Sequence, residues 1–325
     1  MLLFRNRKRI LYLAAALLSV IALLIAMACW ESGHSDFESD SKWELAEFVE
    51  HDGVLYRLRD DVDTLLIMGV DQFWGVLTDV SYNNDQCADF LLLLVIDHAA
   101  KECSAIQINR DTMAEVSVLG VGGKKTGTLT QQITLSHTYG TGGSDSCRNT
   151  ARAVSGLLGN LAIDHYACLT MDAVAALNDL VGGVTVMVED DLTAIDPAFV
   201  QGTTLTLMGD QALRYVRHRS ELADSSNASR MKRQEQYLNA LYPAVLDYVA
   251  QNQSFPTDAV TTLSRYTTTD FSATELERTI ETLSTYRYGS IYRPDGTYQV
   301  DTHMEFVPDM ADLQNIVIDL FYEKK

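Results

Sequence analysis

The chain has 325 residues and is strongly acidic, with 44 Asp and Glu residues against 25 Lys and Arg residues and a formal net charge of −19. This balance argues against nucleic acid as a partner, because nucleic-acid binding needs a broad basic surface. Residues 53–325 contain no Pro/Gly/Ser-rich linker and no internal repeat, which favours one large domain over this range.

The first 30 residues predict a membrane anchor. Residues 1–9 form a tail with four basic residues and no acid, and residues 10–30 form an uncharged apolar run of the length that crosses a bilayer as a helix, about 20 residues. The positive-inside bias places the tail in the cytoplasm. We therefore expect a single-pass protein of the cell membrane, with a polar spacer at 31–52 and an extracellular domain at 53–325. A cleaved signal peptide is the alternative, but the residues before Glu31 make a poor cleavage site.

Four cysteines follow the predicted anchor: Cys87, Cys103, Cys147 and Cys168. An exported location permits disulfides, but four thiols allow three complete pairings and the sequence does not choose among them. The histidines are scattered, and no CxxC or His/Cys spacing predicts a zinc site.

The first part of the domain predicts strands. They are Asp63–Asp71, Phe90–Asp97, which is apolar on nearly every residue, and Cys103–Asn109. A continuous apolar run is typical of a strand that is covered on both faces. The tight connection between the second and third strands predicts an antiparallel hairpin.

The rest of the domain alternates helices and strands. In chain order, we predict a helix at 145–158, a strand at 165–171, a helix at 172–181, a strand at 182–188, a helix at 230–251, a hairpin at 286–301 turning at Pro294–Gly296, and a terminal helix at 310–322. This alternation predicts an α/β domain with a mixed central sheet flanked by helices.

The segment Gln211–Gln236 holds five arginines and a lysine. If its first part is extended, Arg217 and Arg219 leave the same face. In the helix that follows, Arg230, Arg233 and Gln234 share a face at i, i+3 and i+4. Bidentate guanidinium contacts suit phosphate oxygens, so the set predicts a phosphate site. Ordinary surface ion pairs with the many acids are the alternative.

Two acids lie at predicted strand ends, next to a third basic residue. Asp71 ends the first strand, Asp89 precedes the second, and Arg110 follows the third. Mg²⁺ is usually held by one or two carboxylates together with phosphate and water. Asp71 and Asp89 are therefore candidate magnesium ligands, although an aspartate in such a position, taken alone, is more often a loop or capping residue.

An ordered series of motifs runs through these residues: "TLLIMGVD", "ADFLLLLVIDHAAKECSAIQINRDT", "LSHTYGTGG", "DLVGGVTVMV", "LMGDQALRYVRHR" and "ASRMKRQEQ". From about Val62 to Leu241 the chain thereby resembles the LytR-CpsA-Psr family of membrane-anchored cell-wall phosphotransferases. The resemblance implies transfer of a glycan phosphate from a polyprenyl-pyrophosphate carrier onto a peptidoglycan hydroxyl, with Mg²⁺ as the cofactor.

Carried over motif by motif, the resemblance implies that Asp71 and Asp89 bind Mg²⁺. It implies that the pyrophosphate is held by a larger set: Arg110, Arg217, Arg219, Arg230 and Gln234, with Arg233 and Asp224 in the same motifs. Asp89 is our hypothesis for the base that accepts the hydroxyl proton, with Asp111 in reserve. Asp89, Arg110, Arg217 and Arg219 are the catalytic candidates.

The sequence departs from the family pattern at several places. "ADF" replaces Ser-Asp-Thr, "NRDT" replaces Pro-Arg-Asp-Thr, and Ala114 stands where an arginine is common. The spacing between "RHR" and "RMKRQ" is about one residue longer. Two other functions stay open: a pyrophosphatase that uses water at the same site, and a non-catalytic protein that binds lipid-linked glycans or regulates wall enzymes. The glycopolymer is not specified by the sequence.

Overall fold

The computed structural model describes residues 45–71, 84–218, 227–252, 258, 262–271, 286–300 and 303–325. Within these ranges, no helix combines the length and the apolar character that a membrane span needs. The span predicted at 10–30 lies outside them. The chain divides into two compact units. Among the described residues, we call those within 29–168, 268–270 and 289–325 the sheet unit, and those within 169–267 and 271–288 the helical unit. The predicted boundaries at 9/10, 30/31 and 52/53 stay predictions.

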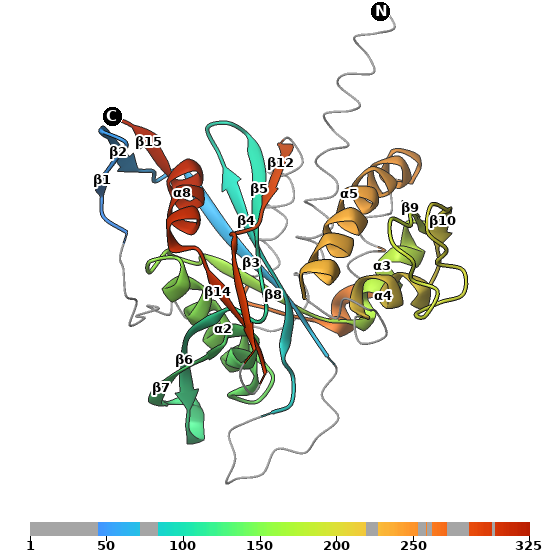
Figure 1. Ribbon diagram of the computed structural model, residues 1–325, viewed down its shortest axis with the longest axis horizontal. Helices are drawn as coiled ribbons and strands as arrows, with labels where there is room; N and C mark the ends of the chain where they lie inside the picture. The colour runs from blue at the N-terminus through green and yellow to red at the C-terminus, as the bar shows by residue number, and fades with distance from the viewer. Residues whose placement is uncertain are drawn as a thin grey trace, which may run out of the picture. The chain divides into compact units, whose positions relative to one another are not determined.

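The central sheet has six strands in the order β11-β8-β3-β4-β5-β12 (Figure 1). Their bounds are β3 Val62–Val70, β4 Ala88–Asp97, β5 Glu102–Ile108, β8 His165–Thr170, β11 Thr267–Thr269 and β12 Arg287–Tyr292. The pairs β3/β4 and β4/β5 are antiparallel, as the predicted hairpin requires. Leu91 to Ile96 are all buried, which confirms that β4 is covered on both faces.

Two amphipathic helices pack against this sheet in one hydrophobic core. Helix α2 spans Ser144–Leu157 and buries Ala151 and Val154, while α8 spans Met310–Phe321 and buries Leu313 and Val317. The three- and four-residue spacing of these positions places them on one face of each helix. Asp309 caps α8 by accepting hydrogen bonds from two main-chain amides of its first turn. The predicted α/β fold with a central sheet flanked by helices is thereby confirmed.

Smaller elements complete the sheet unit. They are β1 Phe48–His51, β2 Val54–Leu58, β6 Met113–Leu119, η1 Val121–Gly123, β7 Lys125–Gln132, η2 Ile133–Thr138, β13 Gly296–Val300, β14 Met304–Pro308 and β15 Tyr322–Lys324. Strands β1, β2 and β15 form one small sheet, and β6/β7 and β13/β14 form two-stranded sheets.

The helical unit has its own core. It contains α3 Asp172–Leu180, β9 Val184–Met187, β10 Thr204–Leu207, α4 Asp210–Arg217, α5 Asn227–Gln251 and η3 Ser264–Tyr266. Val184, Val186 and Val188 are buried together with Phe199 and Tyr215, so the predicted alternation of this strand is confirmed.

The predicted hairpin at 286–301 is wrong, although both of its strands exist. Strand β12 joins the edge of the central sheet beside β5, and β13 pairs instead with β14. The rings of Tyr298 and Phe306 pack 5.1 Å apart across that second pair. A turn signal in the sequence indicates where a strand ends, but side-chain packing decides with which other strand it pairs.

Candidate functional site

The acids predicted at the strand ends lie beside an irregularity in the sheet. Asp71 directly follows β3, and the register changes between Gly69, which faces Phe90, and Val70, which faces Ala88. Asp89 is therefore the extra residue of a β-bulge. Such bulges redirect a side chain at the end of a strand pair and occur often next to active sites.

Arg110 joins this bulge to the end of β5. Its guanidinium donates a short hydrogen bond to Asp89 Oδ1, and its Nε lies 3.3 Å from Asp111 Oδ1. The Arg110 and Asp89 side chains are 15% and 14% exposed, so both remain accessible to a ligand. The Thr134 hydroxyl donates to Asp89 at 3.4 Å. The Arg110 guanidinium is thus held between the carboxylates of Asp89 and Asp111, at the ends of the central strands.

Asp111 occupies a different environment from Asp89. It is 1% exposed. Its main-chain N–H donates to Asn109 Oδ1 at 3.0 Å, and the Gln132 side-chain amide donates to its Oδ1 at 3.1 Å. These contacts suit a residue that positions Arg110. The reserve assignment of Asp111 as a general base stays a prediction, and its burial makes it the weaker candidate because a base needs contact with the substrate hydroxyl.

The "HTYGTGG" motif holds the segment that leads into the bulge. The Asn84 side chain donates to the main-chain oxygens of His137, at 3.0 Å, and Gly140, at 3.2 Å. The Gln86 amide donates to the Asp71 carbonyl at 2.8 Å. Gly142 has a φ of +80°, and a Cβ there would lie 2.4 Å from Gln86 Oε1. The motif therefore supports the segment that leads to the two acids.

The pKa of the Cys87 thiol depends on the charged groups near the two acids. Burial raises the pKa of its thiol, and the nearby carboxylates of Asp89 and Asp71 raise this pKa further, while Arg110 lowers it. The two acids and the arginine are therefore all within electrostatic reach of one side chain. This supports the prediction that Asp71 and Asp89 share one edge of the sheet.

The predicted extended conformation before Arg219 is wrong for the part that the structure describes. Residues Asp210–Arg217 form helix α4, which buries Ala212, Tyr215 and Val216. This spacing places the three residues on one face of a helix. The chain becomes extended at His218. Arg217 is exposed in the last turn of α4, and Arg219 and Asp224 lie outside the described residues.

The other predicted basic residues lie on α5, as expected, but they are buried. Arg233 donates to the main-chain oxygen of Tyr215 at 2.5 Å and to that of His218, and Gln234 donates to that of Val216 at 3.2 Å. These are carbonyl groups at the C-terminal end of α4, where donors and positive charge are favourable. Arg230 donates to Asn227 at 2.5 Å. Burial lowers the pKa of Arg233.

An open groove lies on the helical unit, between α3 and the start of α4. Its volume is about 540 Å³, and its lining includes Asp172, Asp179 and Asp210 with Arg265. Three carboxylates repel a diphosphate, so this groove does not suit the predicted substrate.

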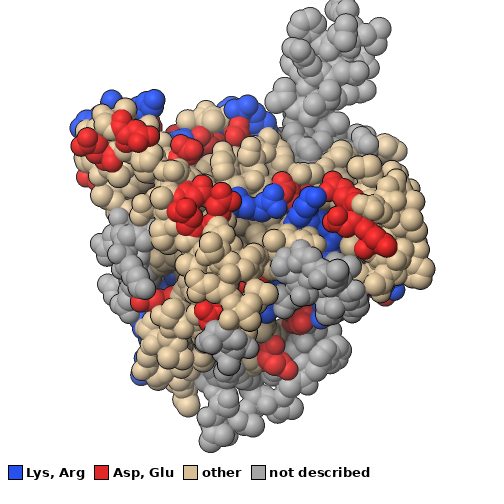
Figure 2. All heavy atoms as spheres, in the orientation of Figure 1, with Lys and Arg blue, Asp and Glu red and all other residues tan. Residues whose placement is uncertain are grey.

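On the face shown in Figure 2, Lys and Arg side chains lie beside Asp and Glu side chains.

Comparison with known proteins identifies the family. A family model described as the LytR_cpsA_psr family matches residues 31–315. The chain belongs to this family. Its sequence is 28% identical over 179 residues to a polyisoprenyl-teichoic acid–peptidoglycan teichoic acid transferase, TagU, of Halalkalibacterium halodurans, which is 54% of each chain. It is 27% identical over 191 residues to biofilm regulatory protein A of Streptococcus mutans, covering 56% of this chain and 44% of that protein. The chain thus spans about half the length of these curated relatives.

Solved structures show the same LytR_cpsA_psr fold. TagV of B. subtilis aligns with a TM-score of 0.57 at 23% identity and covers 81% of this chain and 97% of its own. A structure of TagT bound to LI-WTA aligns with a TM-score of 0.59 at 21% identity and covers 80% and 90%. The predicted family and the mixed α/β sheet are therefore confirmed.

The donors at the sheet edge fit the Mg²⁺ that the family resemblance implies. Asp71 and Asp89 supply hard carboxylate oxygens at neighbouring strand ends, and Mg²⁺ needs one or two such ligands besides water and phosphate. Both acids lie in the sheet unit, together with Arg110, whereas Arg217, Arg230, Arg233 and Gln234 lie in the helical unit.

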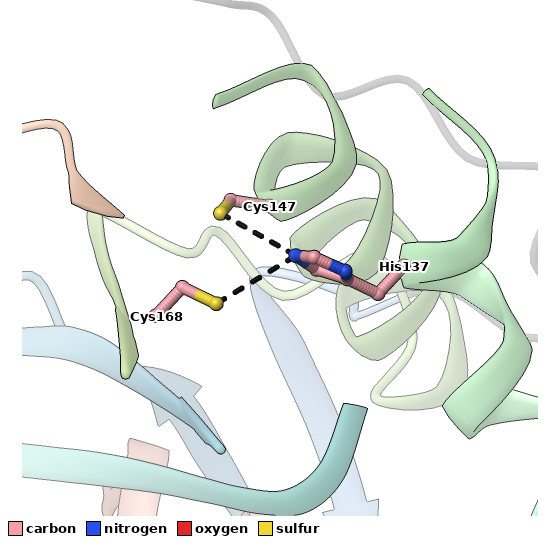
Figure 3. A group of neighbouring side chains, drawn as sticks. All are labelled: His137, Cys147 and Cys168. Atoms are coloured by element: carbon pink, nitrogen blue, oxygen red, sulfur yellow. Dashed lines mark hydrogen bonds between the residues drawn. The ribbon is translucent and has the colours of Figure 1, made fainter. Parts of the chain in front are cut away.

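One group of side chains had no signal in the sequence. His137, Cys147 and Cys168 meet in the interior of the sheet unit (Figure 3), although 31 residues separate the first from the last. None of the four described cysteines forms a disulfide. A hydrogen bond with Cys147 lowers the pKa of Cys168, while burial raises the pKa of Cys147. Only the fold brings these residues together, so no sequence spacing could have revealed them.

Proposed function

We propose that this protein is a phosphotransferase that moves a glycan phosphate from a polyprenyl-pyrophosphate carrier onto a hydroxyl of peptidoglycan. The relatives named as teichoic acid transferases support the reaction class. The observation that supports the proposal is the contact of Arg110 with Asp89 at the bulge, because a guanidinium group suits phosphate oxygens and here lies beside a partly exposed carboxylate.

The reaction makes one bond and breaks one. The acceptor hydroxyl oxygen attacks the glycan-linked phosphorus of the diphosphate, a new P–O bond forms, and the bond to the bridging oxygen breaks. Polyprenyl phosphate leaves with that oxygen. Catalysis of such a transfer depends mainly on alignment and on neutralising charge on the non-bridging oxygens.

Each predicted residue has a part in this proposal. Arg110 would neutralise charge on the diphosphate, and Asp89 would accept the proton of the hydroxyl. Mg²⁺ held by Asp71 and Asp89 would neutralise further charge on phosphate oxygens. The resemblance assigns the pyrophosphate to further residues as well: Arg217, Arg219, Arg230, Arg233 and Gln234. Of these, Arg233 and Gln234 donate to main-chain oxygens at the end of α4.

Membrane attachment is part of the same proposal. The apolar run at 10–30 would hold the protein in the cell membrane with its large domain outside, where both the lipid carrier and the peptidoglycan are accessible. A long apolar pocket for the prenyl chain is the family expectation, and its lining is not assigned.

The test is a transfer assay with the full-length protein. Purified protein in detergent is mixed with a polyprenyl-pyrophosphate-linked glycan, Mg²⁺ and peptidoglycan, and two products are followed: glycan on peptidoglycan and free polyprenyl phosphate. We expect both products to form together and to require peptidoglycan.

Two other outcomes separate the alternatives. Release of polyprenyl phosphate at the same rate without peptidoglycan would identify a pyrophosphatase. Binding of the lipid-linked glycan without release of either product, across the family's usual glycans, would identify a non-catalytic binding protein.

A further inference from the structure

The His137, Cys147 and Cys168 side chains come from three different elements, namely η2, α2 and β8. The His137 Nε2 atom lies 3.8 Å from the Cys147 sulfur and 3.6 Å from the Cys168 sulfur. The three residues are 0%, 0% and 4% exposed. Figure 3 shows both sulfurs directed toward the same ring nitrogen. We call these residues the HCC cluster.

The tautomer of His137 leaves Nε2 available as a ligand. Its Nδ1 lies 3.1 Å from the main-chain oxygen of Gln86, and a carbonyl oxygen can only accept a hydrogen bond. We therefore assign the ring proton to Nδ1, so the lone pair of Nε2 faces the two sulfurs. Metal-binding histidines are typically oriented in this way, with the second nitrogen donating to a carbonyl or carboxylate.

The distances match those around a metal ion. A Zn²⁺ ion lies about 2.0–2.1 Å from a histidine nitrogen and about 2.3 Å from a thiolate sulfur, which in tetrahedral geometry holds the two donors about 3.6 Å apart. The observed distances are 3.6 and 3.8 Å. All three donor atoms lie within 4.8 Å of one another. The two observed nitrogen–sulfur distances are therefore close to those that one zinc ion shared by these donors requires.

We propose that the HCC cluster binds one thiophilic divalent cation, with Zn²⁺ as the preferred ion. Thiolate and imidazole donors select such metals. A neutral imidazole and two thiolates carry two negative charges, which Zn²⁺ neutralises, and a neutral set is favoured where burial makes net charge costly. Binding releases the thiol protons to solvent. Zn²⁺ accepts three protein donors with a fourth position left open.

The position of the cluster suggests a use, which rests on the proposed function. His137 binds the Gln86 carbonyl, the Gln86 amide donates to the Asp71 carbonyl at 2.8 Å, and Asp89 lies three residues after Gln86. An ion on Nε2 would fix the orientation of the His137 ring and thereby this segment. The HCC cluster would thus act on the two acids indirectly, by positioning Gln86 and the segment that leads to Asp89.

The first test measures metal in the purified full-length protein by mass spectrometry. We expect about one Zn²⁺ per chain in the wild-type protein. In Cys147→Ala and in Cys168→Ala the zinc content per chain should fall by at least about tenfold. Cys103→Ala is the matched control, since Cys103 is equally buried, on β5, and it should keep its metal. Equal zinc in all three variants would overturn the proposal.

The second test does not depend on whether a variant folds. Wild-type protein is stripped with a chelator and then titrated with Zn²⁺ alone and with Co²⁺ alone. Zn²⁺ should raise the melting temperature, and Co²⁺ should give the charge-transfer absorption of cobalt–thiolate bonds. Absence of both responses, or a Cys147–Cys168 disulfide in the protein as purified, would overturn the proposal.

The readouts also distinguish this inference from the proposed function. Metal content and cobalt absorption need no substrate, so they remain informative if the transfer assay fails. If the HCC cluster positions the acids, the stripped protein should lose transfer activity and regain it with Zn²⁺ in the presence of saturating Mg²⁺. Zinc binding without any effect on an active transferase would overturn the positioning role alone.

Discussion

The guanidinium of Arg110 donates a hydrogen bond to the carboxylate of Asp89 at the bulge that opens β4. The opposite end of the same strand carries a second pair of this kind, in which Arg59 binds Asp97 through both nitrogens at 2.6 and 2.7 Å. The two pairs are similarly buried, with side chains 13–20% exposed. One strand therefore supplies a candidate catalytic pair and a matched structural control.

Replacing the candidate pair should abolish transfer and leave folding intact. We expect Asp89→Asn to lower the transfer rate by about 10²–10⁴-fold, because it removes a base, and Arg110→Ala by about 10²–10³-fold, because it removes charge stabilisation of the diphosphate. The rates are measured in the peptidoglycan transfer assay. Asp97→Asn is the control and should keep the wild-type rate. Near-normal turnover of Asp89→Asn would remove Asp89 from both its proposed roles.

The Arg59–Asp97 pair should make stability depend on pH. The hydrogen bond from Arg59 lowers the pKa of Asp97 relative to about 3.9 in an unfolded chain. A carboxyl with a lowered folded pKa stabilises the fold above that unfolded value, and the contribution is lost as pH falls through the folded pKa. Asp97→Asn should therefore lower the free energy of unfolding by about 1 kcal/mol at pH 7.

The same difference should shrink toward zero as pH falls through the lowered pKa of Asp97, because the wild-type carboxyl is also neutral below it. Urea denaturation of both proteins across this pH range measures it. A wild-type advantage of equal size at both ends of the range would show that the charge of Asp97 contributes nothing.

Gly142→Ala should damage the site through Gln86. Gly142 and Gly122 both have positive φ, at +80° and +74°, but a Cβ at Gly142 would meet Gln86 Oε1 at 2.4 Å, whereas one at Gly122 meets nothing within 4 Å. We expect Gly122→Ala to cost about 1 kcal/mol of stability for its backbone strain alone. Gly142→Ala should cost about 1–3 kcal/mol and also lower transfer, because Gln86 holds the Asp71 carbonyl.

Thermal denaturation and the transfer assay, applied to both glycine variants, separate strain from contact. If the two variants lose the same stability and keep the same activity, Gln86 yields to the added methyl group and the motif does not support the acids.

Replacing Arg233 should mainly lower stability, whereas replacing Arg217 should mainly lower the transfer rate. Arg233 is buried and binds two main-chain oxygens at the end of α4, so Arg233→Ala should destabilise the protein by about 2–3 kcal/mol. Arg217 is exposed, and Arg217→Ala should change stability by no more than about 0.5 kcal/mol. Its transfer rate should still fall at least about tenfold, as loss of a charged hydrogen bond to phosphate implies.

Urea denaturation and transfer rates of the two arginine variants provide this comparison. An Arg217→Ala protein with full activity would exclude Arg217 from the phosphate contacts and would favour the ordinary surface role for this residue.

Patterns within single elements were readable from the sequence. The continuous apolar run of β4, the alternating valines of β9 and the helical spacing in α2 and α8 are local signals, because burial on a strand or helix follows its own period. The same reasoning failed for Tyr215–Arg217, where apolar helical spacing outweighed the extended conformation that we expected from the neighbouring arginines.

The sequence by itself determined the family, the strands at whose ends Asp71, Asp89 and Arg110 lie, and the helix that carries Arg230 to Gln234. The tertiary structure alone decided that β12 and β13 part, that Arg233 caps a helix, and that His137 meets Cys147 and Cys168. These facts depend on contacts between distant segments. Such contacts are selected by packing in three dimensions, which leaves no period or spacing along the chain.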